Sequence, residues 1–218
     1  MPLEPIYKLR DWIPLKKLTW ENLGTNTHPG VFPILESIVK KKKRQFLRSA
    51  MYTYKMAISR NTNAIDYLSN HMDEIDWREL TLNPNAIPLI EKNLDRIDWE
   101  WLSSNPNAIP ILRKNKEMIN WCRLSKNYNA IELLLENPDK INWDSLCLNE
   151  NPDAIEILKE NQDKINWSYL SYNENAIKLI KKNLNKIDWR YLSYNSNSIK
   201  LLRKNQDKIN WYNLSSNP

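Results

Sequence analysis

Residues 83–104 read NPNAIPLIEKNLDRIDWEWLSS, and variants of this 22-residue stretch recur along most of the chain. Its most regular mark is a tryptophan, which returns every 22 residues except for one interval of 24. The tryptophans of this series are Trp77, Trp99, Trp121, Trp143, Trp167, Trp189 and Trp211. A short fixed period is typical of repeat arrays, in which each unit buries its apolar face against its neighbours.

Within one repeat the pattern predicts two short helices. Asn83 stands before a proline, and this pair is a common helix start. The apolar side chains of residues 86–90 share one helical face, which predicts a first helix of about nine or ten residues. We expect Asn93 to end that helix in a left-handed conformation. Asp98 then caps a second helix of about five to seven residues, which carries Trp99 inward.

Asparagine and aspartate also recur at fixed positions. The residue before each tryptophan is Asp or Asn, which both cap helices but differ in charge, so their exchange indicates capping rather than catalysis. Two further positions hold asparagine in successive repeats. They are Asn83, Asn105, Asn127, Asn151, Asn173 and Asn195 for the first, and Asn93, Asn115, Asn137, Asn161, Asn183 and Asn205 for the second.

These patterns predict an all-α fold, an α-solenoid of short helix pairs with a 22-residue repeat and about eight layers. We expect one domain over residues 1–218, with regular repeats in 61–218. Residues 1–60 would form degenerate N-terminal repeats and a cap, with a basic insertion at 36–50. The sequence stops where another helix would start, so either the last layer is open or a partner or second copy covers it.

Composition narrows the class of protein. Hydrophobic residues make up 41%, enough to bury a continuous core. Cys122 and Cys147 show no paired pattern, which favours a reducing, intracellular compartment. Neither a signal-peptide core nor an apolar run long enough to span a membrane is expected. The net charge of +6 is uneven, with 9 basic and 13 acidic residues in 83–160 against 10 and 4 in 161–218.

The motif of residues 83–90, continued by Ile97, Asp98 and Trp99, resembles that of repeat proteins of giant nucleocytoplasmic DNA viruses of amoebae. The opening stretch 7–15 is similar to their leader. The resemblance implies a viral protein in the host cytoplasm or nucleus, or in the virion. It implies no catalytic residues and no cofactor.

Two sets of side chains near the C-terminal end are candidates for partner binding. The cations expected on the outer face of two successive first helices would suit nucleic acid or an acidic protein, or would form an ordinary solvated face. They are Lys178, Lys181, Lys182, Lys200, Arg203 and Lys204. The tyrosines one, two or five residues after a tryptophan would anchor an interface, or belong to an unconstrained surface. They are Tyr169, Tyr172, Tyr191, Tyr194 and Tyr212.

A third candidate is a run of cations in the insertion, which would be a nuclear-targeting or nucleic-acid segment or a charged linker. It comprises Lys40, Lys41, Lys42, Lys43 and Arg44. His28 and His71 lack metal-ligand spacing, and no glycine-rich phosphate loop is present. Because repetition spreads residues evenly and catalysis needs a unique convergence, we expect no enzyme, metal or cofactor.

The sequence therefore favours a non-catalytic scaffold that binds a protein partner through residues 167–212. One alternative is a nucleic-acid-binding protein that uses the C-terminal basic face. Another is a structural virion or factory component that forms a homodimer through its C-terminal layer.

Overall fold

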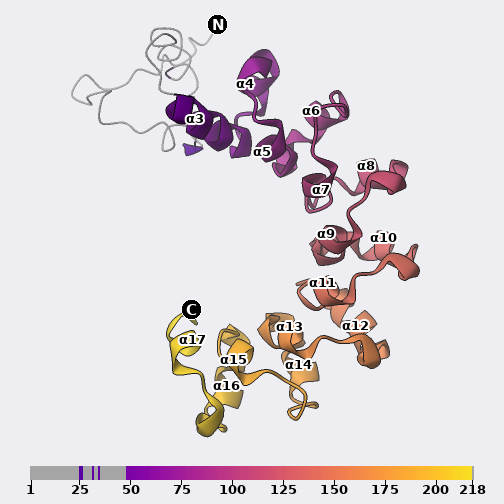
Figure 1. Ribbon diagram of the computed structural model, residues 1–218, viewed down its shortest axis with the longest axis vertical. Coiled ribbons are helices and arrows are strands. Elements are labelled where there is room, and N and C mark those ends of the chain that lie inside the picture. The colour runs from indigo at the N-terminus through magenta and orange to yellow at the C-terminus, as the bar shows by residue number, and fades with distance from the viewer. Residues whose placement is uncertain (1–24, 27–30, 32–33, 35–47, 218) are drawn as a thin grey trace, which may run out of the picture. The chain divides into compact units, whose positions relative to one another are not determined.

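The computed structural model describes residues 25–26, 31, 34 and 48–217 (Figure 1). Every regular element in these residues is a helix, and they comprise fifteen α-helices and nine short 3-10 helices with no strand. The all-α fold class is therefore confirmed. The basic run 40–44 and the predicted N-terminal cap lie outside the described residues. Among the described helices, none is long and apolar enough to cross a membrane.

The chain divides into two compact units, Met1–Ala108 and Ile109–Pro218. In the first unit the α-helices are α3 (Arg48–Arg60), α4 (Ile65–Asn70), α5 (Trp77–Thr81), α6 (Ile87–Glu91) and α7 (Trp99–Leu102). In the second they are α8 (Ile109–Lys114), α9 (Trp121–Lys126), α10 (Ile131–Leu135), α11 (Trp143–Cys147), α12 (Pro152–Glu160), α13 (Trp167–Tyr172), α14 (Ile177–Ile180), α15 (Trp189–Leu192), α16 (Ile199–Leu202) and α17 (Trp211–Ser215).

Nine 3-10 helices lie between them. They are η2 (Met72–Glu74), η3 (Pro84–Ala86), η4 (Lys116–Met118), η5 (Tyr128–Ala130), η6 (Pro138–Lys140), η7 (Gln162–Lys164), η8 (Glu174–Ala176), η9 (Ser196–Ser198) and η10 (Gln206–Lys208).

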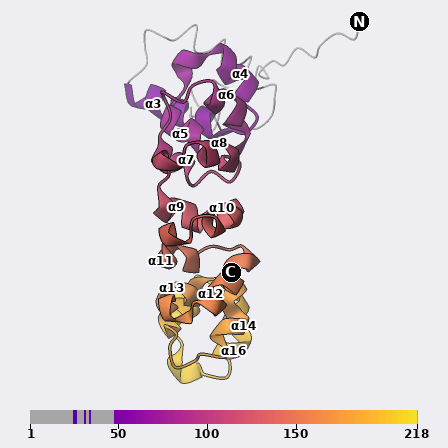
Figure 2. The ribbon, with the colours of Figure 1, turned by 90° about the vertical axis from the view of Figure 1, so that its right-hand side faces the viewer.

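The α-helices of the second unit lie in two rows. The helices that begin at a tryptophan, α9, α11, α13, α15 and α17, follow one another along one row (Figure 1). The first helices of the repeats, α10, α12, α14 and α16, lie beside them in a second row (Figure 2). The two helix types predicted from the sequence are thus separated in space, and each row presents its own surface.

The predicted first helix is shorter than expected. Only α12 runs unbroken for nine residues, whereas α6, α10, α14 and α16 follow a 3-10 helix and are four or five residues long. Asn83 shows why, because its side chain accepts from the Asn85 N–H at 3.1 Å and its carbonyl accepts from the Ala86 N–H at 3.1 Å. Both bonds close a turn tighter than an α-helical one.

The prediction of a left-handed helix end is wrong. No described residue has a positive φ. Instead the Asn93 side-chain amide donates to the Leu89 carbonyl at 2.8 Å, and Asn115 donates to Ile111 in the same way at 2.8 Å. The amide satisfies a carbonyl that the ending helix leaves without a partner, so no left-handed residue is needed.

Apart from Tyr54, the buried hydrophobic side chains of the described residues are aliphatic or small. One leucine is fully buried in each of six helices that begin at a tryptophan, α5, α7, α9, α11, α13 and α15. These leucines are Leu80, Leu102, Leu124, Leu146, Leu170 and Leu192. A small residue, such as Ala86 at the end of η3 and Ser198 at the end of η9, is fully buried just before the α-helix that follows and allows close approach of neighbouring helices.

The tryptophans are less deeply buried than predicted. Six of the seven are half-buried, and Trp211 is 65% exposed. The residue three positions before the next tryptophan often covers the indole face: Lys164 Nζ lies 4.4 Å from the Trp143 ring, and Lys208 Nζ lies 4.8 Å from Trp189. Each of these indoles is therefore packed on one side and meets a cation on the other, a cation–π arrangement.

Candidate functional site

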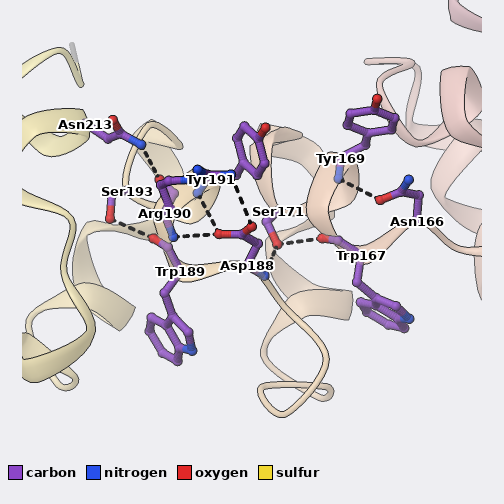
Figure 3. Close-up of polar contacts among 10 residues, drawn as sticks. All are labelled: Asn166, Trp167, Tyr169, Ser171, Asp188, Trp189, Arg190, Tyr191, Ser193 and Asn213. Carbon is purple, nitrogen blue, oxygen red and sulfur yellow. Dashed lines mark hydrogen bonds and ion pairs between the residues drawn. The ribbon is translucent and has the colours of Figure 1, made fainter.

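Hydrogen bonds to side chains fix where each helix of the tryptophan row begins. Asp188 accepts from the backbone N–H groups of Arg190 at 2.9 Å and Tyr191 at 3.3 Å (Figure 3). The Asp188 N–H in turn donates to Ser171 Oγ at 3.0 Å, and that hydroxyl donates to the Trp167 carbonyl at 2.6 Å. One serine thus ties the end of α13 to the start of α15.

The capping role predicted for the residue before each tryptophan is confirmed. Each of these Asp and Asn side chains accepts from a backbone N–H of the helix that follows. They are Asp76, Asp98, Asn120, Asn142, Asn166, Asp188 and Asn210.

A second set of asparagines joins neighbouring repeats from inside. The buried Asn195 amide donates to the carbonyls of Ser171 at 3.1 Å and Asn173 at 2.9 Å, while its oxygen accepts from the Asn197 N–H. Asn173 makes the matching bonds to the carbonyls of Cys147 at 2.9 Å and Asn149 at 2.7 Å. These asparagines therefore cap a turn and bridge to the preceding repeat at once.

In the repeat with the longer interval, two asparagines divide these roles: Asn149 bridges to the preceding repeat and Asn151 starts the helix, as its place in the series predicts. Asn149 makes the two buried bonds, to the carbonyls of Ser125 at 3.0 Å and Asn127 at 2.9 Å. Asn151 instead caps α12 and donates to the Tyr128 carbonyl at 2.8 Å, as Asn197 does to Glu174 at 3.1 Å. The 24-residue interval between Trp143 and Trp167 has two more residues than the others, and this difference falls between Asn149 and Asn151.

The candidate tyrosines gather on the tryptophan row. Tyr169 and Tyr191 project from α13 and α15 on the side opposite Trp167 and Trp189 (Figure 3). We name Tyr169, Tyr172, Tyr191, Tyr194 and Tyr212 the tyrosine surface.

Rings from successive helices meet on the tyrosine surface. The Tyr172 and Tyr194 ring centroids are 6.1 Å apart, and the Arg190 guanidinium lies 4.9 Å from the Tyr191 ring. Tyr169, Tyr172 and Tyr212 are exposed, and Tyr212 reaches 80%. The helices α13, α15 and α17 thus carry accessible aromatic rings supported by their neighbours.

The candidate cations lie on the other row and are all exposed. Lys178 is in α14 and Lys200 in α16, while the remaining four follow the last residues of these two helices. Within the described part of the chain, none of the six lies within ion-pair distance of a carboxylate. They form a basic face separate from the tyrosine surface.

Sequence reasoning missed a buried polar cluster in the first unit. The Tyr54 and Tyr67 hydroxyls each donate to Glu74 at 2.8 Å, and Tyr67 stacks on His71 with ring centroids 4.1 Å apart. Burial is the main cause that raises the pKa of Tyr54 far above its ordinary value. Because its members are bonded to one another, the cluster fastens α3 to the segment around α4.

No arrangement typical of metal binding is found in the described residues: no three His, Cys, Asp or Glu side chains there are placed to hold an ion. Cys122 and Cys147 are free thiols, the first exposed and the second buried. Near the C-terminal end of the described residues, an open cavity of about 240 Å³ lies between α16 and α17, with Leu202, Trp211 and Leu214 in its lining.

Comparison with known proteins identifies no relative. No family model, curated protein or solved structure matches this chain.

Proposed function

We propose that the chain is an α-solenoid of 22-residue repeats and acts as a non-catalytic scaffold whose tyrosine surface binds a protein partner. The 22-residue spacing of the buried asparagine bonds supports the solenoid, since each repeat is tied to the one before it. Such arrays present extended surfaces rather than single reactive centres.

The observation that carries the binding proposal is the placement of exposed tyrosines along one side of a helix row. Tyrosine is enriched among residues that dominate protein interfaces, because its ring offers a large contact area and its hydroxyl a polar bond. Tyr172 and Tyr194 touch across two helices, so little ordering is needed before a partner docks. The adjacent Arg190 adds a cation beside the rings.

Site-specific photo-crosslinking tests the proposal. A photoreactive phenylalanine analogue placed at Tyr172 or Tyr212 is expected to capture the same protein in the cell that expresses the chain. Tyr128 is the matched control, since it is 52% exposed against 53% for Tyr172 yet lies outside the tyrosine surface. Equal capture from Tyr128, or no shared protein from Tyr172 and Tyr212, would contradict the proposal.

A further inference from the structure

The gap between α12 and α14 holds an open cavity of about 690 Å³ that is lined mainly by lysines. Lys159 and Gln162 face it from α12 and η7, and Lys178, Lys181 and Lys182 face it from α14 and the turn after it. No carboxylate lines it. Cavities of roughly 300–1,000 Å³ are the usual size of small-molecule sites.

The equivalent gap between α8 and α10 has a different chemistry. There Arg113 lies 2.9 Å from Glu136 and 3.6 Å from Glu132, and Lys116 lies 3.6 Å from Glu136. Cations from one first helix thus meet carboxylates from the next. These surface ion pairs neutralise the gap from within the chain.

Alignment of the repeats shows that the cavity lies at the position of the gap between α8 and α10. Lysines stand there in place of the glutamates. Counted from the small buried residue of each repeat, Lys159 stands where Arg113 stands, and Lys178 and Lys182 stand where Glu132 and Glu136 stand. Among the described residues, Lys159 forms an ion pair only with Glu156 of its own helix, at 2.5 Å. The cations around the cavity therefore face one another, and like charges in such a gap repel.

We propose that this cavity is a binding site for a compact phosphate-bearing anion, whose oxygens take the place of the missing glutamates. Several ammonium groups converge on it, and each is a point charge suited to phosphate oxygens. The Gln162 amide adds a neutral donor. No aromatic ring lines the cavity, so it offers no stacking platform for bases. This favours a small polyphosphate over a nucleic-acid strand.

Inorganic tripolyphosphate is the probe, titrated into the full-length chain by calorimetry at low salt. We expect saturable binding with one anion per chain. The variant Lys178→Glu/Lys182→Glu recreates the ion-pair arrangement of α8 and α10, so it is expected to fold with an unchanged or higher Tm. Its affinity for tripolyphosphate should fall at least about tenfold, since two attractive charges become repulsive.

The control variant Lys114→Glu/Lys126→Glu makes the same change of net charge at exposed positions outside the cavity. It should bind within about twofold of the unaltered chain, because screening at moderate salt limits the reach of surface charge. Absence of tripolyphosphate binding would overturn the proposal, and so would equal loss in both variants. A single-stranded oligonucleotide that binds more tightly than tripolyphosphate would overturn it in favour of an extended nucleic-acid surface.

Discussion

At the scale of single residues, the choice between asparagine and aspartate follows from the number of bonds each position must make. The cap before each tryptophan of the series requires only an acceptor, so Asp98 and Asn120 serve equally well there. The buried position accepts and also donates twice to the preceding repeat, as Asn105 and Asn195 do. Only a side-chain amide provides both an acceptor and donors at that length, which explains why aspartate is not found there.

Replacement of one buried asparagine should therefore lower the free energy of unfolding substantially. Asn195→Ala leaves the buried carbonyls of Ser171 and Asn173 without this donor, and each unsatisfied buried group costs about 1–3 kcal/mol. Asn197→Ala is the matched control, since the exposed Asn197 donates to Glu174 and water can replace that bond. Urea unfolding should show a large decrease in the free energy of unfolding for Asn195→Ala. For Asn197→Ala the decrease should be at most about 0.5 kcal/mol. Equal losses would contradict this account.

The buried thiol of Cys147 leads to a prediction about the stability of the protein at alkaline pH. Burial raises the pKa of its thiol from 9.0 to about 11. A pKa raised on folding stabilises the native state fully below pH 9, and this contribution is lost as the pH rises through 11. The free energy of unfolding should therefore fall across that window.

The control for this prediction is Cys147→Ser, because Ser125 and Ser171 occupy the same position in neighbouring repeats. We expect the serine variant to show a shallower fall between pH 9 and 11 when chemical unfolding is repeated at each pH. Identical pH profiles for the two proteins would show that the thiol contributes nothing.

At the scale of helices, the sequence allowed prediction of the two helix types and of the residue that starts each helix of the tryptophan row. The aliphatic stripe and the Asp or Asn before each tryptophan contain that information locally. The split of the first helix was not predicted, because Asn83 serves as a cap in both an α-helix and a 3-10 turn. The half-buried tryptophans were missed since hydrophobicity does not reveal that a cation such as Lys208 covers one indole face.

Part of the candidate surfaces was also predictable. The tyrosines and cations are placed by the repeat period, so their separation onto two helix rows follows from their positions after Trp167 or after Ala176. The bonds from each asparagine to the preceding repeat depend on the distance between helices, which no local pattern gives. A usable signal existed nonetheless, because a cap position that never holds aspartate requires a donor.

A helix cap gives a test at this scale. Asp188→Ala removes the acceptor for the Arg190 and Tyr191 N–H groups at the start of α15, and a lost N-cap costs about 0.5–2 kcal/mol. Asp188→Asn should be close to neutral, since Asn120 and Asn166 cap the equivalent helices. Thermal unfolding of the two variants checks this. A neutral result for alanine would show that the cap bonds do not stabilise α15.

At the scale of the whole molecule, the proposed solenoid implies that stability depends on nearest neighbours. Each repeat buries only a few side chains, such as Ala130, Leu133 and Leu134 around its first helix and Leu146 in its second, which is too little for a helix pair to fold alone. The bonds from each buried asparagine reach only the preceding repeat. Damage at one such junction should therefore open the adjacent repeats first and leave distant ones protected.

Hydrogen exchange of an Asn173→Ala variant, followed peptide by peptide by mass spectrometry, tests this coupling most directly. The account predicts faster exchange in the peptides that cover α11, α12 and α14, next to the lost bonds to Cys147 and Asn149. Protection around α5 and α6 should stay at the level of the unaltered chain. A uniform loss of protection over residues 48–217, or no change near Asn173, would contradict it.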